Sequence, residues 1–367
     1  MCRPFYIKRR YSTVVVLSLL MLLSNAAMSS EYGPYLSLQS ITYSEPVSID
    51  AMLNEWDSPY KGGDKAFAYY KAEIGIERNT WHLGVLNRLD YFMTFSEQTA
   101  QLYYYTKNHL PLEAGKSYAL NIDVLHEYSR GLRFGFERQL LQNVNAGIAV
   151  SYLEGLKLTD GTINGNAMVT ADNDYDFQFD VDYAYSRDTL FEREVSAPHG
   201  KGYSVDMELD WQVSEKFASH LTVLDMLGQI VWDNAPYTTA TASSATKTYD
   251  ADGYVRYQPL ATGLESNKNF KQRLPRKIFA DISYSLNRKM NVLAEVQDYK
   301  IARFASVGAG WRWPGRGEFQ SLYNLTAKAL ILRYQRNKLR LEVGSDNFWI
   351  RRRESYFSLL LSYAAGF

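Results

Sequence analysis

The sequence predicts an all-β fold, a transmembrane antiparallel up-and-down β-barrel of about 14 strands, within a range of about 12 to 16. Apolar and polar residues alternate along most of the chain, which is typical of strands whose two faces meet different environments. After an export signal, no other apolar stretch is long enough to form a membrane-spanning helix. A closed barrel is then the remaining way to cross a membrane with every backbone polar group satisfied.

Residues 1–27 are predicted to be a secretory signal peptide. The first ten residues are basic, an apolar run extends from Val14 to Leu23, and small residues at 24–27 supply a cleavage site. The apolar run is too short to span a membrane as a stop-transfer helix. We expect cleavage after Ala26 or Ala27.

Composition narrows the class of protein. The 367 residues hold 40 basic and 40 acidic side chains, and four of the basic ones lie in the leader, so the mature chain carries a charge of about −4. This balance argues against a nucleic-acid partner. The single cysteine, Cys2, also lies in the leader, which excludes a disulfide, a cysteine metal site and a thiol nucleophile. The 29 tyrosines and 7 tryptophans suit membrane–water interfaces.

Residues 28–64 alternate weakly and are predicted to precede the barrel, which then covers residues 65–367. Ser48 could cap a short helix from Ile49 to Trp56, and Pro59 with Gly62 would end it. Two interpretations stay open for this segment, a periplasmic extension leading to the first strand or a plug inside the lumen.

Alternating segments follow in order from residue 67. They are expected at 67–77, 81–90, 118–125, 132–137, 146–152, 175–185, 203–213, 217–232, 278–284, 292–296, 305–313, 325–334, 339–343 and 356–367. The apolar sets of 175–185 and 203–213 run for about 11 residues with aromatics at both ends, which favours lipid over a soluble core. Three further candidate segments, at 98–106, 162–170 and 250–260, bring the number to 17. A closed barrel with both termini on one side needs an even number of strands, so at least one candidate is not a barrel strand, and we expect it among these three.

Two polar stretches are predicted to be extracellular loops. Residues 233–275 are rich in Thr, Ser and Ala and would form one long loop with a hairpin around Tyr249–Leu260, and residues 188–200 would form another. The run Tyr103 to Tyr105 is predicted to belong to an interfacial aromatic girdle rather than to a sugar-binding platform.

The end of the chain alternates most regularly. Leu361, Tyr363, Ala365 and Phe367 share one apolar face of the last segment. A strand that ends the chain on an aromatic residue resembles those of Gram-negative outer-membrane β-barrel proteins. The resemblance is to the class, and it implies a cell outer membrane location, contact with membrane lipid and lipopolysaccharide, and recognition of these four residues by the barrel assembly machinery.

The lumen is predicted to be charged. Asp176, Asp180 and Asp182 share one face of their segment, and Asp206, Glu208 and Asp210 share one face of the next, so neighbouring strands would form an acidic wall. Such a wall needs cations or basic partners, which Arg133, Arg312 and Arg340 could supply. Either a cation-favouring pore or a lumen filled by salt bridges fits this pattern.

The function predicted is a pore or transporter for small or amphipathic solutes, with a small solute as the ligand. An alternative is a non-conducting accessory barrel that supports a surface assembly or secretion system. A barrel hydrolase that uses one of the five histidines is a third interpretation, but the sequence contains neither a Gly-x-Ser-x-Gly nor a His-Glu-x-x-His motif. No catalytic residue, no cofactor and no metal is expected, since the Asp-x-Asp spacing lacks the rest of a calcium loop.

Overall fold

The computed structural model describes residues 32–171, 174–190, 193–244, 247–249, 255–257, 262–348 and 354–365. The predicted signal peptide and the terminal Phe367 lie outside the described residues. Among the described residues, no helix has the length and apolar character needed to traverse a bilayer.

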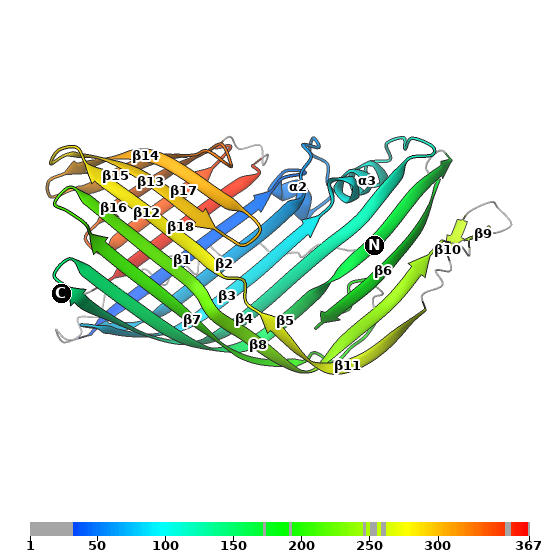
Figure 1. The fold of residues 1–367 in the computed structure, drawn as a ribbon, viewed down its shortest axis with the longest axis horizontal. Coiled ribbons are helices and arrows are strands. Elements are labelled where there is room, and N and C mark those ends of the chain that lie inside the picture. Colours follow the sequence, from blue (N-terminus) through cyan, green and yellow to red (C-terminus); the bar gives the residue numbers. More distant parts are fainter. Residues whose placement is uncertain are drawn as a thin grey trace.

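Fourteen antiparallel strands close into a ring, as the alternation predicted (Figure 1). The ring is closed because β1 pairs with β2 on one edge and with the last strand, β18, on the other, with Leu38 opposite Leu361. Its strands are β1 (Gly33–Ser44), β2 (Lys65–Arg78), β3 (Trp81–Phe95), β4 (Ser117–Leu141), β5 (Val144–Ala171), β7 (His199–Gln212), β8 (Phe217–Ser243), β12 (Lys277–Ser285), β13 (Met290–Asp298), β14 (Arg303–Trp313), β15 (Gly317–Asn324), β16 (Ala329–Arg336), β17 (Leu339–Ser345) and β18 (Tyr356–Ala364).

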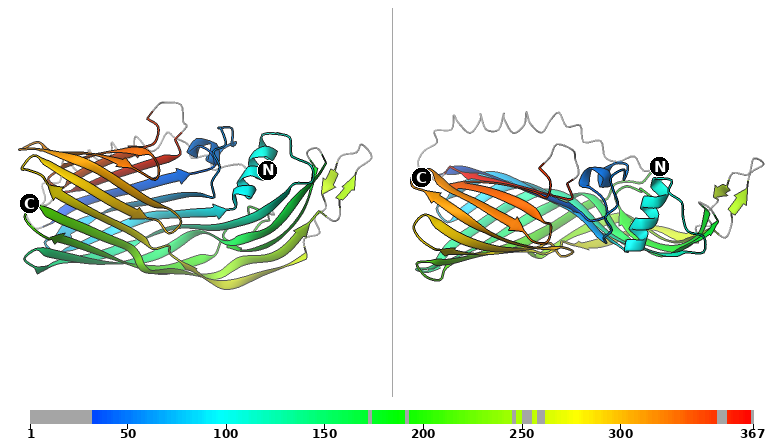
Figure 2. Two further views of the ribbon diagram at one scale, coloured as in Figure 1. Left: turned by 45° about the horizontal axis from the view of Figure 1, so that its top comes forward. Right: turned by 90° about the horizontal axis from the view of Figure 1, so that it is seen from above.

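One side of the wall extends well beyond the ring (Figure 2). The extended strands β4, β5 and β8 contain 25, 28 and 27 residues, whereas β15 to β18 contain seven to nine. Two more strands widen this extension. β6 (Asp174–Tyr185) lies between the far halves of β5 and β8, and β11 (Thr262–Arg273) pairs with the other edge of β8. A separate small hairpin joins β9 (Lys247–Tyr249) to β10 (Val255–Tyr257).

The two ends of the barrel differ. At the end where β1 begins and β18 finishes, short turns link β2 to β3, β4 to β5, β7 to β8, β12 to β13, β14 to β15 and β16 to β17. We call this the turn end. The opposite loop end carries α2 (Ile49–Leu53) and α3 (Glu97–Lys107). Both helices begin at a serine whose hydroxyl accepts a backbone N–H, from Ala51 to Ser48 at 3.3 Å and from Thr99 to Ser96 at 3.0 Å.

Several predicted boundaries are wrong. Residues 33–44 form the first barrel strand instead of a plug or periplasmic segment, and residues 45–64 connect β1 to β2 at the loop end. The alternation of β1 is weak because its lumen face carries Ser37 and Gln39 and its outer face carries Ser40 and Thr42. The candidate strand at 98–106 is instead helix α3. Much of the predicted loop 233–275 consists of the extended ends of β8 and β11.

The outer surface of the ring is apolar. Strand residues that point away from the lumen include many large apolar side chains that are 38–59% exposed, among them Leu83, Val85, Leu132, Phe134, Phe136, Ile148, Val150, Tyr152, Tyr203, Leu227, Val307 and Trp311. Residues at alternate positions point inward and are mostly polar or charged. A closed antiparallel ring with an apolar outside and a polar inside is the architecture of Gram-negative outer-membrane barrels.

A row of polar side chains ends the apolar belt on the extended side. Asn87, Arg130, Glu154 and Lys201 occupy paired positions on β3, β4, β5 and β7, and the Arg130 and Glu154 side chains form an exposed ion pair at 2.7 Å. From this row to the turn end, β7 runs from Tyr203 to Trp211, which matches the ~9–11 residues that a tilted strand needs to cross a bilayer. The extension therefore lies beyond the bilayer.

The belt predicts a position-dependent cost for a charge on β5. Ile148, 51% exposed, lies midway between the polar row and the turn after Leu141. We expect Ile148→Arg to lower the free energy of unfolding, measured in lipid vesicles, by about 2–4 kcal/mol, because the guanidinium would face hydrocarbon. Asn164→Arg, on the same strand in the extension, is the control. Equal losses in the two variants would contradict this placement of the belt.

Candidate functional site

Aromatic side chains fill the lumen toward the loop end. Phe67, Phe92, Tyr299, Phe304 and Tyr356, which we call the aromatic layer, are all at most 4% exposed. The ring centroids of Tyr299 and Phe67 lie 5.2 Å apart, those of Phe67 and Phe92 lie 5.6 Å apart, and those of Phe304 and Tyr356 lie 5.4 Å apart. Tyr299 follows β13, several strands away from β2 around the ring, so these contacts reach across the lumen.

A buried charged layer adjoins the aromatic layer. Asp225 on β8 accepts two hydrogen bonds from the Arg88 guanidinium, at 2.7 and 2.8 Å, and one from the Lys277 ammonium at 2.9 Å. Lys277 also lies 2.9 Å from Asp90, and Arg88 lies 3.3 Å from Glu127 and contacts Asp90. All five side chains are buried. Ion pairs between β3, β8 and β12 thus join separate parts of the wall through the lumen.

Two further charged clusters line the lumen. In one, Arg133 contacts Asp206 and lies 3.5 Å from Glu73, while Lys71 lies 3.7 Å from both carboxylates. In the other, Arg333 lies 2.7 Å from Glu342 and also contacts Glu295 at 2.5 Å. Of the interpretations left open by the sequence, these contacts match a lumen filled by salt bridges.

The prediction of a single acidic wall is wrong. Asp176, Asp180 and Asp182 lie on β6, and Asp206, Glu208 and Asp210 lie on β7, but these two strands do not pair with each other. Both pair with the same edge of β5, β6 with residues 159–171 and β7 with residues 144–155, so they lie end to end. The β6 acids therefore belong to the extension, where Asp180 accepts a hydrogen bond from Thr241 at 2.5 Å.

The three predicted basic partners have different neighbours. Arg133 contacts one of the six acids, Asp206. Arg312 instead pairs with Glu318 at 2.9 Å, and Arg340 lies 3.7 Å from Glu342. Arg312 and Arg340 line a cavity of about 610 Å³ at the turn end.

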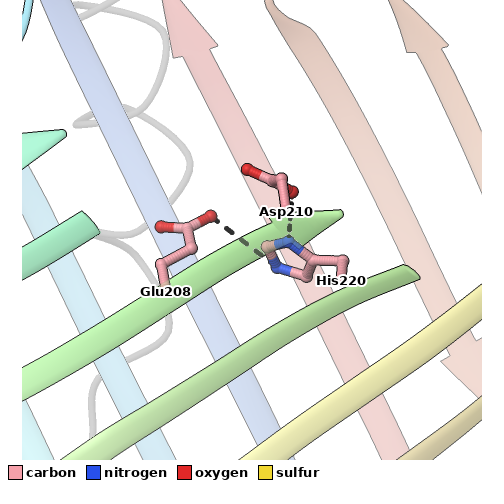
Figure 3. A group of neighbouring side chains, drawn as sticks. All are labelled: Glu208, Asp210 and His220. Atoms are coloured by element: carbon pink, nitrogen blue, oxygen red, sulfur yellow. Dashed lines mark hydrogen bonds and ion pairs between the residues drawn. The ribbon is translucent and has the colours of Figure 1, made fainter. Parts of the chain in front are cut away.

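A second lumen cavity, of about 340 Å³, is lined in part by Glu208, His220 and Asp281. The His220 ring points toward two carboxylates (Figure 3). Its Nδ1 atom lies 2.6 Å from an Asp210 oxygen, and its Nε2 atom lies 3.7 Å from a Glu208 oxygen and 2.9 Å from the Thr222 hydroxyl. These contacts join β7 to β8 near the turn that links them.

A half-enclosed apolar pocket of about 480 Å³ lies at the loop end, on the outer face of the extended wall. We call it the outer pocket. Strands β3 to β6 form its floor, α2 and α3 and the segment after β6 form its rim, and Figure 2 shows α3 against this part of the sheet. Its lining includes Met52, Trp56, Met93, Tyr103, Val124, Ile163, Val181, Tyr183 and Leu190.

Local packing holds the rim of the outer pocket in place. Ala51 of α2 and Ala100 of α3 are buried with Trp56, Ala66 and Phe95. Leu102 of α3 packs with Leu112 and Tyr118. Sequence reasoning missed this pocket because it assigned Tyr103 to an aromatic girdle. A usable signal was Ser96 as a helix cap ahead of Glu97–Lys107.

The predicted assembly residues occupy the last strand. Leu361 and Tyr363 of β18 point to the outer face, Tyr363 with 37% of its side chain exposed, and the Ala365 N–H donates to the Pro34 carbonyl at 2.8 Å. Their recognition by an assembly machinery stays a prediction.

Comparison with known proteins identifies a family and several similar solved structures. A family model described as a family of unknown function (DUF5723) matches residues 39–339. No curated protein matches the chain.

Among solved structures, the Pseudomonas putida toluene transporter TodX is similar with 10% identity and a TM-score of 0.41, over 93% of this chain and 91% of that one. The TodX deltaS2S3 mutant, a monoaromatic hydrocarbon channel, has a TM-score of 0.43, with 10% identity and the same coverage. A Pseudomonas aeruginosa FadL homologue has a TM-score of 0.39 and 10% identity, over 91% of this chain and 90% of that one.

Proposed function

The chain belongs to the family described as a family of unknown function (DUF5723), and from its structure we propose that it binds a small apolar or amphipathic solute in the outer pocket and passes it across the outer membrane. The outer pocket carries the proposal. Its volume of about 480 Å³ lies within the ~300–1,000 Å³ typical of small-molecule sites, and its lining is mostly aromatic and aliphatic with few polar groups.

The position of the outer pocket supports capture outside the bilayer. The polar row of Asn87, Arg130, Glu154 and Lys201 separates the pocket from the lipid-facing belt, so a solute reaches it from the aqueous side. His126 and Thr159 add polar groups to the lining, which would let an amphipathic molecule hydrogen bond while its apolar part lies against Ile163 and Val181.

Passage requires movement inside the lumen. The aromatic layer and the buried charged layer occupy the interior, and the cavities of the turn end lie beyond them. We propose that solute transfer displaces the aromatic layer while the charged layer keeps the wall together. Aromatic contacts are the easier of the two to rearrange, because opening a buried ion network would expose unpaired charges.

A filled lumen also favours a second candidate, the non-conducting accessory barrel. In that case the extension would bind a protein partner, and the outer pocket would hold one of its side chains. The experiment below distinguishes the two because only the first requires binding of a free small molecule.

Filling the outer pocket is expected to abolish solute binding. Ile163 lines the pocket, whereas the adjacent Asn164 lies on the opposite face of β5 and accepts a hydrogen bond from Asn121 at 3.1 Å. We expect Ile163→Trp to weaken binding of the apolar dye N-phenyl-1-naphthylamine at least tenfold, because the indole would occupy the cavity. Asn164→Trp is the matched control. Fluorescence titration of the protein in nanodiscs measures both, and equal affinities would contradict the proposal.

A further inference from the structure

We propose that the lumen holds a site for a divalent transition-metal ion near the turn between β7 and β8, built on the His220 imidazole with the carboxylates of Glu208, Asp210 and Asp281. His220 and Glu208 would bind the ion directly, and Asp210 would orient the imidazole. One ligand atom from each of Glu208, Asp210 and His220 lies within 4.8 Å of the others (Figure 3).

Strand register places these groups together. His220 on β8 is opposite Asp210 on β7 and opposite Asp281 on β12, so the three residues form one row across the inner face. Directly opposite residues in an antiparallel sheet have Cβ atoms about 4.5–5.5 Å apart. Glu208 lies two residues from Asp210 on the same face of β7. The imidazole is thus flanked by a carboxylate on each side.

The orientation of the imidazole suits a metal. When Nδ1–H donates to Asp210, at 2.6 Å, the neutral ring presents the Nε2 lone pair toward Glu208. A carboxylate that holds the second ring nitrogen is the usual support of a metal-binding histidine. The Nε2 atom and the Glu208 oxygen lie 3.7 Å apart, a separation that an ion about 2.0–2.2 Å from each atom would bridge. The Thr222 hydroxyl, 2.9 Å from Nε2, would turn away from the ring when the ion binds.

The charge of this region also favours a cation. Within the described part of the chain, His220 is the one basic side chain that forms an ion pair with Glu208 or Asp210. Glu137 adds a further carboxylate close to Glu208, because both side chains flank Gly147. A Cβ atom placed on Gly147 would lie 3.2 Å from the Glu137 Cγ atom and 3.5 Å from the Glu208 Cβ atom. Arg333 and Arg340, which share the 340 Å³ cavity with Asp281, contact Glu342. A single imidazolium would leave several neighbouring carboxylates without a counter-charge.

The donor set selects the kind of ion. One imidazole nitrogen with carboxylate oxygens suits Zn²⁺ and its neighbours in the first transition row, whereas Ca²⁺ and Mg²⁺ prefer oxygen ligands alone. Glu208 and Asp210 are partly exposed, with 48% and 55% of their side chains accessible, so an ion can enter from the lumen and water can complete its coordination.

Titration of Zn²⁺ into the purified, chelator-treated full-length protein in detergent tests the site. We expect one Zn²⁺ per chain in isothermal titration calorimetry, at least tenfold weaker binding in His220→Gln and Glu208→Gln, and about 10–100-fold weaker binding in Asp210→Asn. His199→Gln, at an exposed histidine at the start of β7, is the matched control and is expected to bind like the unaltered protein.

Two outcomes would overturn the proposal: no stoichiometric Zn²⁺ binding to the unaltered protein, or equal affinity in His220→Gln and His199→Gln. A gel-mobility assay for the folded barrel accompanies each titration. If His220→Gln does not fold, the visible spectrum of the Co²⁺-loaded unaltered protein decides. A d–d band that changes in Asp210→Asn supports the site, and a spectrum the same as that of free aqueous Co²⁺ refutes it.

Discussion

Replacing Asp225 with Asn is expected to lower the free energy of unfolding by about 3–5 kcal/mol. The Asp225 carboxylate accepts hydrogen bonds from Arg88, Lys277 and Ser204, and the two cations are buried with it. An amide of the same shape leaves both cations without this charge, and its NH₂ group would face a donor. Removing one partner of a buried ion pair costs more than the pair contributes, because the remaining charges stay desolvated.

Urea unfolding from lipid vesicles, followed by tryptophan fluorescence, measures this loss. Glu154→Gln is the control, because it removes an ion pair with Arg130 in which both side chains are largely exposed to solvent. We expect no measurable change in that variant, since exposed pairs contribute little. A similar small effect in Asp225→Asn would mean that water reaches the charged layer, and the lumen would then be open at that level.

The class of fold could be predicted from the sequence because lipid imposes a period of two on each strand. Strands such as β7, where Tyr203, Val205, Met207, Leu209 and Trp211 alternate with polar residues, show that period clearly. Strand β1 was missed because both of its faces mix polar and apolar residues. The length of the extension was missed too. In the extension, helices and loops instead of lipid cover the apolar face of the strands, and both kinds of contact give the same alternation in the sequence.

The candidate sites depended on register, which the sequence does not contain. The acids of β6 and β7 looked like one wall because the two segments follow each other in the chain, but β5 is long enough to pair with both in succession. Likewise, the proximity of His220 to Asp281 follows from the pairing of β8 with β12, more than 60 residues apart in the sequence. Local pattern therefore gave the orientation of many side chains, and tertiary pairing decided their neighbours.

Opening the aromatic layer is expected to convert a silent barrel into a conducting one. Tyr299 and Phe304 are 1% and 0% exposed, and their rings lie 6.1 Å apart in the centre of the layer. Tyr299 also contacts Phe67, Tyr69 and Phe279, with ring centroids 5.2, 6.0 and 5.4 Å away. The double variant Tyr299→Ala and Phe304→Ala removes two rings that fill the lumen, and water can enter the space they leave because polar groups adjoin it.

Planar-bilayer recording measures the effect. We expect no steady current from the unaltered protein and stepwise, ion-carrying currents from the double variant. Tyr323→Ala, which removes an aromatic ring from the outer face of β15 where it is 47% exposed, is the control for general loosening of the wall. Current in the control as well would trace conduction to a weakened wall. Silence in the double variant would place the barrier at the charged layer, and transport would then require Arg88, Asp225 and Lys277 to separate, at a cost that favours the accessory role instead.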